Sequence, residues 1–168
     1  MQGRATPLNA DPLGSMREIR RSQLGDLEVV VSWLSDGAEC ELWAGSRVSF
    51  PVDPDRLPEA LEWERADSWS VTRDGEVCAF GQLVPKPCKR IHLARLIAAP
   101  KDRGAGLGRE LATYLLDTAL ARQPDRVSLN VSPENAPAFS LYHSLGFRVV
   151  ERPSDEPQSR SSYMEHAA

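Results

Sequence analysis

Three glycines in five positions, Gly104, Gly106 and Gly108, stand directly before a run of good helix formers in the segment APKDRGAGLGRELATYLLDTAL, residues 99–120. A strand-like apolar segment, RIHLARLIAA, precedes them. The first N–H groups of a helix have no intrahelical partner, and the helix dipole adds about half a positive charge there. Glycines let an anion approach these amides without a Cβ in the way. The pattern therefore predicts a phosphate or pyrophosphate site.

Two common nucleotide motifs fit this segment poorly. A P-loop requires G-x-x-x-x-G-K-[ST], and no Lys followed by Ser or Thr comes after the glycines. The dinucleotide fingerprint G-x-G-x-x-G/A, read from Gly104, meets Arg109 at its last position. Asp125 lies about 20 residues further on, as a ribose-binding acid would, but it precedes the next strand instead of ending it. An ordinary tight turn would need only one or two glycines.

Residues 103–108, RGAGLG, resemble the R-x-x-G-x-G pyrophosphate loop of the GNAT superfamily of acetyl-CoA-dependent N-acetyltransferases. A second block, LNVSPENAPAFSLYHSLGFRVVE, resembles the family pattern L-x-V-x-x-x-N-x-x-A-x-x-L-Y-x-x-x-G-F. The positions in register are Leu129, Val131, Asn135, Ala138, Leu141, Tyr142, Gly146 and Phe147. The resemblance is specific from about Ile91 to Glu151 and only topological before it. It implies a single α/β domain of mixed α+β type, in which a splayed, mostly antiparallel sheet is flanked by helices.

The resemblance also implies which residues bind acetyl-CoA. The main chain of Leu96, Ile97 and Ala98 would bond the pantetheine arm as an added strand would, between the strands at 91–98 and 127–131. Asn135 matches the position that touches the cofactor arm, and a helix N-cap is a second, compatible role for it. The loop residues that would hold the pyrophosphate are Arg103, Gly104, Ala105, Gly106, Leu107, Gly108 and Arg109, of which Arg109 could equally be a solvated surface residue.

Two residues are the candidates for acid–base catalysis. Tyr142 matches the family tyrosine that protonates the departing CoA thiolate, and an unperturbed tyrosine stays protonated at neutral pH; its alternative is a half-buried core residue. Some family members carry a glutamate at the position of Asn130, which cannot take a proton. Others carry a base on the strand before the glycines, where this chain has His92, whose alternative is a strand-end histidine facing solvent. Glu134, in the loop before the next helix, is a poorer candidate.

An alternating series of elements must position these residues. REIRRS (17–22) is a strand candidate, GDLEVVVSWL (25–34) a helix with Asp26 as N-cap, and GAECELWAG (37–45) a helix closed by Gly45. Residues 46–68 are mostly loop with one helical turn, and a hairpin turns at Asp74-Gly75. The next predicted elements are a strand at 90–99, a helix from Leu107 to about Arg122 and a strand at 126–132. They are followed by a helix from Asn135 to Gly146 and by paired strands at 147–152 and 161–166.

Composition narrows the class of protein. The chain has 168 residues and a formal net charge of −4, which disfavours a nonspecific nucleic-acid binder. No apolar run approaches the length of a membrane span, and the N-terminus lacks the apolar centre of a signal peptide, so we expect a cytoplasmic protein without nucleic-acid or membrane partners. Residues 1–15 are predicted to be a flexible leader, with GSM a candidate cloning scar, and residues 16–168 the domain. We expect a monomer or homodimer.

The sequence predicts neither a metal site nor a cysteine nucleophile. The three histidines are dispersed without zinc-ligand spacing. Cys40, Cys78 and Cys88 form no C-x-x-C pair and are read as reduced thiols. Cys78 or Cys88 as an acyl-carrying nucleophile is the weaker alternative, because neither lies in a recognisable base-paired context.

The resemblance implies an N-acetyltransferase that moves the acetyl group of acetyl-CoA to a primary amine by direct attack in a ternary complex. The acceptor, a small amine or a protein or peptide amine, is not specified by any motif. Trp33, Trp43, Trp63 and Trp69 fall in the variable half, where they would pack the core or line the acceptor wall. A non-catalytic acetyl-CoA-binding sensor or scaffold stays open as the alternative, and Asn130 favours it.

Overall fold

The computed structural model describes residues 6–8 and 14–167. Eight strands form one sheet in the order β1-β2-β3-β4-β5-β6-β8-β7. In chain order they are β1 (Thr6–Leu8), β2 (Arg17–Arg21), β3 (Asp67–Arg73), β4 (Glu76–Lys86), β5 (Arg90–Ala98), β6 (Arg126–Val131), β7 (Arg148–Val149) and β8 (Ser162–Ala167). All neighbouring strands are antiparallel except β5 and β6, which are parallel. The expected mostly antiparallel mixed sheet is confirmed.

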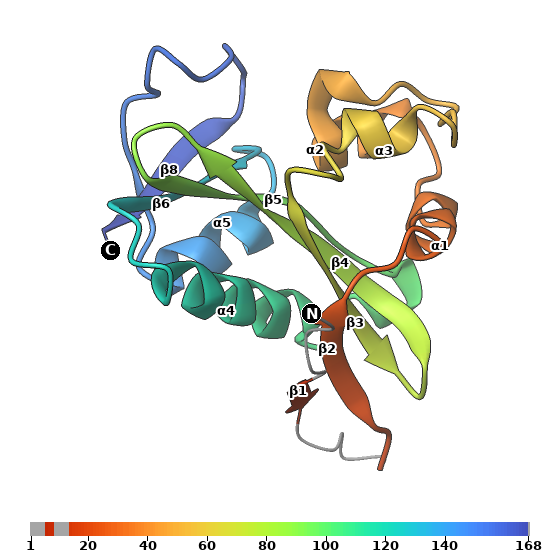
Figure 1. The fold of residues 1–168 in the computed structure, drawn as a ribbon. Helices are drawn as coiled ribbons and strands as arrows, with labels where there is room; N and C mark the ends of the chain where they lie inside the picture. The colour runs from red at the N-terminus through yellow and green to blue at the C-terminus, as the bar shows by residue number, and fades with distance from the viewer. Residues whose placement is uncertain (1–5, 9–13, 168) are drawn as a thin grey trace.

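The helices cover both faces of the sheet (Figure 1). On one face lie α1 (Asp26–Ser32), α2 (Gly37–Ala44), the 3₁₀ turn η1 (Gly45–Arg47) and α3 (Leu57–Ala60). On the other lie α4 (Leu107–Leu120), which follows the turn η2 (Pro100–Asp102), and α5 (Ala136–Ser144). None of the helices within the described residues is long and apolar enough to cross a membrane.

Each face has its own hydrophobic core. The larger core packs the leucine face of α4, including Leu107, Leu111 and Leu115, against the sheet together with Phe147 and Met164. The smaller core packs α1, α2 and α3 around Trp43, Leu61 and the opposite-facing strand residue Phe80. Since the side chains of a strand alternate between faces, one strand, β4, serves both cores.

The sheet opens between β5 and β6. These strands pair only from Arg90–Arg126 to Leu93–Leu129, after which β5 continues to Ala98 and β6 to Val131 without further pairing between them. Just beyond the last pair, β5 also carries a bulge: Gln82 pairs with Ala94 but Phe80 pairs with Ile97, and Arg95 adopts a left-handed φ of 57°. The bulge bends the strand at the point where it leaves its neighbour. The result is the expected splay.

Most predicted elements are confirmed, with two corrections. The hairpin at Asp74-Gly75, the helix after the glycines and the last strand pair all form. Asp26 is wrong as an N-cap: Gly25 is the cap, and the Asp26 carboxylate is buried, where it accepts hydrogen bonds from Arg20 and Ser70. Within the predicted flexible leader, residues 6–8 form a strand, β1, that pairs with β2. Residues 1–5 and 9–13 of that leader lie outside the described residues.

Candidate functional site

The glycine loop forms the start of α4 and lies at the open end of the splay. Gly104 and Gly106 have φ values of 82° and 83°, which side-chain-bearing residues rarely adopt, and a Cβ on either would meet open space. The first bond of the helix runs from the Glu110 amide to the Gly106 carbonyl, at 3.0 Å. The amides of residues 106–109 therefore precede the helical hydrogen-bond ladder and are available to a ligand.

Two arginines from this loop carry charge on its outer side. Arg103 pairs with Glu39 of α2 across 3.7 Å, and about half of its side chain is exposed. Arg109 donates to the Ser144 hydroxyl at 3.2 Å and so connects α4 to α5 at the surface. Gly108 adopts no positive φ, and its added Cβ would only touch Leu141 at 4.0 Å. Of the three glycines, the backbone geometry thus demands Gly104 and Gly106.

Buried ion pairs fasten the loop to the sheet. Arg73 of β3 donates to the Asp102 carboxylate at 2.5 Å, directly before the loop. Arg17 of β2 donates to Glu110 at 2.8 Å, within the first turn of α4. Asp102 and Arg17 are both buried. Because the strands of the N-terminal half hold both ends of the loop, its amides keep a fixed direction before any anion binds.

The helix α5 positions the two predicted residues of the second block. Asn135 caps it, since its side chain accepts from the Ala138 amide at 3.3 Å. Tyr142, two turns later, is buried and packs edge-on against Phe147. Burial raises the pKa of the Tyr142 hydroxyl to about 12, because the phenolate would lose its hydration. This side chain stays protonated at neutral pH.

A cavity of about 90 Å³ lies in the splay and brings several of these residues together. Its apolar lining comes from β5, β6, α2 and α5. Its polar lining consists of Asn130, Ser132, Asn135 and Tyr142, and its only charged member among the described residues is Arg95. Leu96 lines it, whereas His92 and the glycine loop do not. Asn130, Asn135 and Tyr142 therefore share one chamber.

His92 lies behind this chamber. It is the third residue of β5 and only 6% exposed, so the alternative that it faces solvent is wrong. Its Nδ1 contacts the Ser128 hydroxyl at 2.8 Å, and its Nε2 lies 3.3 Å from the Asn130 amide nitrogen. Because the amide nitrogen can only donate, Nε2 is the acceptor and Nδ1 carries the hydrogen. Burial, together with the nearby cations Lys86, Arg90, Arg95 and Arg152, lowers the pKa of His92 to about 3.

The bulge in β5 brings residues to the site that no sequence motif predicted. The Trp43 indole of α2 donates to the Arg95 carbonyl at 2.8 Å, which connects α2 to the bulge. The Arg95 guanidinium donates to Gln82 at 2.7 Å and to the Leu61 carbonyl at 3.2 Å. An arginine with positive φ has no sequence signal, so only the indole of Trp43, already singled out, could have pointed here.

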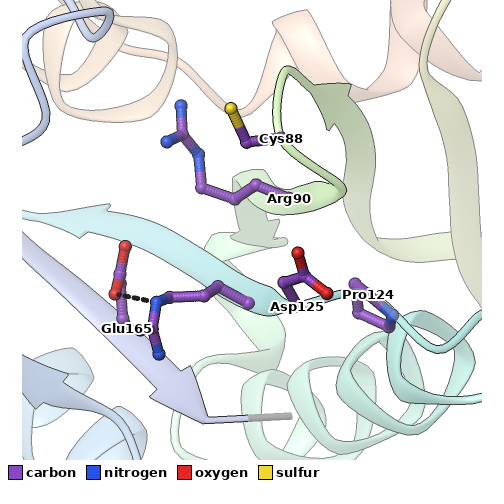
Figure 2. Close-up of a pocket in the computed structure, with 6 residues that line it drawn as sticks. Cys88, Arg90, Pro124, Asp125 and Glu165 are labelled. Atoms are coloured by element: carbon purple, nitrogen blue, oxygen red, sulfur yellow. Dashed lines mark ion pairs between the residues drawn. The ribbon is translucent and has the colours of Figure 1, made fainter.

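A larger hollow, of about 560 Å³, lies at the opposite ends of β5 and β6. Figure 2 shows it between Cys88 and Arg90 on the β5 side and Asp125, Pro124 and Glu165 on the other. Arg126 pairs with Glu165 across 3.2 Å, and Arg90 pairs with Asp155 across 2.8 Å. Both of its arginines are thus paired with carboxylates, and of the residues weighed above it contains only Cys88 and Asp125, which belong to the weaker alternatives. Among the described residues, no group of three or more His, Cys, Asp or Glu side chains is placed to hold a metal.

Comparison with known proteins assigns a family to this geometry. The chain is 32% identical to streptothricin acetyltransferase of Streptomyces lavendulae over 113 residues, which are 65% of this chain and 60% of that protein. It is 32% identical over 84 residues to the [ribosomal protein bS18]-alanine N-acetyltransferase of Escherichia coli K12, covering 50% of this chain and 56% of that protein. The chain thus spans less than two thirds of these curated relatives.

Solved structures share the fold at lower identity. The PaiA N-acetyltransferase from Thermoplasma acidophilum, solved in complex with coenzyme A, superposes with a TM-score of 0.68 at 19% identity, over 90% of this chain and 99% of that one. The sequence also matches the acetyltransferase (GNAT) family over residues 33–147, which include the glycine loop, the splayed strands and α5. The chain belongs to the GNAT acetyltransferase family.

Proposed function

We propose that this protein is an acetyl-CoA-dependent N-acetyltransferase that moves an acetyl group to a primary amine by direct attack in a ternary complex. The observation that carries the proposal is the joining of two features at one cleft. The glycine loop follows the splayed end of β5, and its amides at residues 106–109 precede the helical hydrogen bonds of α4, while Tyr142 and Asn130 line the chamber in the splay. A loop that can bind an anion, next to an apolar chamber that contains the proton donor Tyr142, fits an acetyl donor with a charged diphosphate at one end and a reactive thioester at the other.

The residues of the cleft fit acetyl-CoA, which supplies the acetyl group as an activated thioester when bound. Gly104 and Gly106 leave open the space that a Cβ would fill, so diphosphate oxygens can reach the amides of residues 106–109. Arg103 would exchange its pairing with Glu39 for a phosphate. The stretch of β5 beyond Leu93 pairs with β4 but not with β6. It includes Leu96, Ile97 and Ala98, and its main-chain groups on the β6 side are offered to the pantetheine arm.

Tyr142 is proposed to act as the general acid. Its hydroxyl keeps its proton because burial raises its pKa to about 12, and its ring lines the chamber. A departing thiolate takes up this proton, which prevents its return to the acetyl group. Preorganised amides and close approach of the two substrates in the chamber supply the remaining acceleration.

His92 fits the role of a direct base less well than the sequence predicts. Both of its ring nitrogens already contact protein groups, Ser128 and Asn130, and its low pKa leaves it a weak proton acceptor. In this proposal His92 is a positioning residue that orients the Asn130 amide. Two relatives are named for acetylation of streptothricin and of an alanine of a ribosomal protein, and these names support an amine acceptor for this chain as well.

A thermal-shift series followed by a turnover assay tests the proposal. Acetyl-CoA and CoA should stabilise the protein, by about 2.7 kcal/mol at 100 times the dissociation constant, and NADH and ATP should not. CoA release with a panel of amines and peptides should then depend on the amine. Stabilisation by acetyl-CoA with no release for any amine would favour the sensor or scaffold alternative, which the absence of a carboxylate at Asn130 supports.

A further inference from the structure

The loop that is proposed to bind the diphosphate has an acidic residue at each of its ends. Asp102 lies two residues before Gly104, so their Cα atoms are no more than about 8 Å apart. Glu110 lies in the first turn of α4, four residues after Gly106. A carboxylate at either position repels an anion bound by the amides between them, and Glu110 also competes for the positive end of the helix dipole. The loop can therefore bind an anion well only if these two charges are compensated.

Two arginines of the N-terminal strands compensate them. Arg73 of β3 pairs with Asp102 across 2.5 Å, and Arg17 of β2 pairs with Glu110 across 2.8 Å. Arg17 and Arg73 are direct partners in the register of β2 and β3, a position in which two like charges destabilise a sheet. The carboxylates from the two ends of the loop offset this repulsion, so the four charges form one neutral cluster.

The four charges lie close together in a buried region. The pKa of the Cys78 thiol in β4 is raised to about 11, mainly because the thiol is buried. The two carboxylates raise this pKa as well and the two arginines lower it, so all four charges act on the same thiol. One oxygen of each carboxylate, Oδ2 of Asp102 and Oε2 of Glu110, is buried without a hydrogen-bond partner among the described residues. Each carboxylate therefore depends on its arginine for compensation of its charge.

We propose that Arg17 and Arg73 are positioning residues of the donor site, which neutralise Glu110 and Asp102 so that the loop between these carboxylates can hold the diphosphate of acetyl-CoA. The N-terminal strands thus control the affinity of the loop for an anion. This inference rests on the acetyl-CoA binding of the proposed function and not on acetyl transfer, so it holds for a sensor or scaffold as well.

Charge compensation and simple anchoring of the loop predict different results. If the ion pairs only anchor the loop, loss of either partner of a pair should weaken CoA binding. If the arginines compensate charge, the two partners should act in opposite directions. Arg73→Gln leaves the Asp102 carboxylate uncompensated. Asp102→Asn removes that negative charge and keeps a side-chain oxygen that can accept a hydrogen bond from Arg73.

Calorimetric titration with CoA at pH 8 and low salt distinguishes these two roles. Arg73→Gln should bind CoA about tenfold more weakly than the wild type, because one uncompensated charge at about 10 Å costs roughly this factor at an effective dielectric constant of about 20. Asp102→Asn should bind CoA about threefold more tightly, and the double variant should lie within about threefold of the wild type. Raising the salt to about 0.5 M should reduce the loss in Arg73→Gln to about threefold.

Arg20→Gln is the matched control for loss of a buried ion pair. Arg20 pairs with Asp26 of α1 across 2.7 Å, and 24% of its side chain is exposed, against 25% for Arg73. This variant should lose similar stability in urea unfolding and keep its CoA affinity. Pantetheine, the thiol arm of CoA without its phosphates, is the control ligand. Its affinity, measured by thermal shift at millimolar concentration, should be the same in the wild type and in Arg73→Gln.

Two results would overturn the inference: wild-type CoA affinity in Arg73→Gln, or weaker CoA binding in Asp102→Asn than in the wild type. If Arg73→Gln does not fold, Asp102→Asn and Arg73→Lys decide, since Arg73→Lys keeps the charge and should bind CoA within about threefold of the wild type. Loss of CoA binding in a folded Arg73→Lys would mean that the shape of the pair matters and not its charge. If the wild type binds no CoA, the proposed function itself fails, together with the inference that rests on it.

Discussion

The proposed donor side and the proposed acceptor side of the cleft are formed by different groups, main-chain groups on the first and side chains on the second. On the donor side, the groups offered to a ligand belong to the main chain: the amides at the start of α4 and the end of β5, which pairs with β4 but not with β6. On the acceptor side, the lining depends on side chains brought together from α2, β5, β6 and α5, such as Trp43, Arg95 and Asn130. The first kind of site requires particular backbone conformations, and the second requires particular side-chain neighbours.

This difference determines which amino-acid substitutions each side of the cleft can tolerate. A backbone site tolerates few residues at positions such as Gly106, because φ is positive there and a ligand must approach closely. A side-chain wall can exchange its members and keep its shape, so it can be adapted to a new acceptor without disturbing the donor site. The donor side is thus the fixed part of the enzyme, and the acceptor side the adjustable part.

The largest effect is expected for Gly106→Val. The branched side chain strains a residue with φ of 83° and blocks the approach of phosphate to the amides. Losing two charge-assisted hydrogen bonds, at about 1.5–3 kcal/mol each, weakens CoA binding by roughly 10²- to 10⁴-fold. Calorimetric titration with CoA measures this.

Gly75→Val is the matched control for backbone strain. Gly75 has a φ of 87° and open space around it, but lies in the β3–β4 turn. It should lose similar stability and keep its CoA affinity, while Gly108→Ala should bind CoA normally. Equal CoA affinity in folded Gly106→Val and wild type would remove the loop from the donor site.

Tyr142→Phe should lower kcat by 10- to 10³-fold while acetyl-CoA affinity stays nearly constant. The ring and its packing on Phe147 are kept, and only the proton donor is lost. Stopped-flow CoA release under single-turnover conditions isolates the chemical step. Tyr114→Phe, on the sheet-facing side of α4 against Trp69, is the control and should leave kcat unchanged. An unchanged single-turnover rate in Tyr142→Phe would make this tyrosine a packing residue only.

His92 lies behind the chamber, and its burial predicts a pH effect on stability. Its pKa of about 3 in the folded protein lies below the ordinary value of 6.5, so the unfolded chain binds the proton more readily. The contribution of His92 is therefore complete above about pH 6.5 and is lost as the pH falls toward 3, by about 1.4 kcal/mol per pH unit. Urea unfolding at pH 7 and pH 5 should show about 2 kcal/mol from this residue.

Substitutions of two histidines separate this effect from general acid destabilisation. His92→Gln should be less sensitive to the change from pH 7 to pH 5 by that amount. His143→Gln, at an exposed position of α5, should behave as the wild type does. The same pH response in all three proteins would mean that His92 is solvated and able to titrate near neutrality.

The smallest effect on binding is expected for a substitution on the proposed acceptor side. Trp43→Phe removes the indole donor to the Arg95 carbonyl and keeps an aromatic ring in the wall. Loss of one hydrogen bond costs about 1 kcal/mol, so the KM for the acceptor should rise about fivefold. The dissociation constant of acetyl-CoA should not change, which is the reverse of the Gly106→Val pattern. A change confined to acetyl-CoA binding would contradict the division between the two sides.

The features that depend on local backbone conformation could be predicted from the sequence, and those that depend on side-chain neighbours could not. The helix start after the glycines, the Asn135 cap and the Asp74-Gly75 turn follow from local signals, and each one forms as predicted. The burial of His92 could not be predicted in this way, because which face of a strand is covered depends on what packs there. The buried pairing of Asp26 with Arg20 and Ser70 is of the same kind, since Ser70 lies 44 residues away.

Other features escaped prediction because tertiary contacts override local preference. Arg95 takes a left-handed conformation that its own residue type disfavours, and its bonds to Gln82 and Leu61 come from distant segments. Residues 6–8 form β1 through pairing with β2, although nothing in their own sequence indicates a strand. The lining of the chamber depends on these contacts, so it could not be predicted from the sequence alone.

The short pairing of β5 with β6 has a consequence for how the sheet holds together. Only four residue pairs join these strands, and they join segments separated in the chain by the whole of α4. Every other neighbouring pair is antiparallel. Closing the loop that contains α4 costs conformational entropy, which these few pairs offset only in part. Amide hydrogens at this seam should accordingly exchange sooner than those of β3 and β4, and a donor that bridges both strands should slow that exchange.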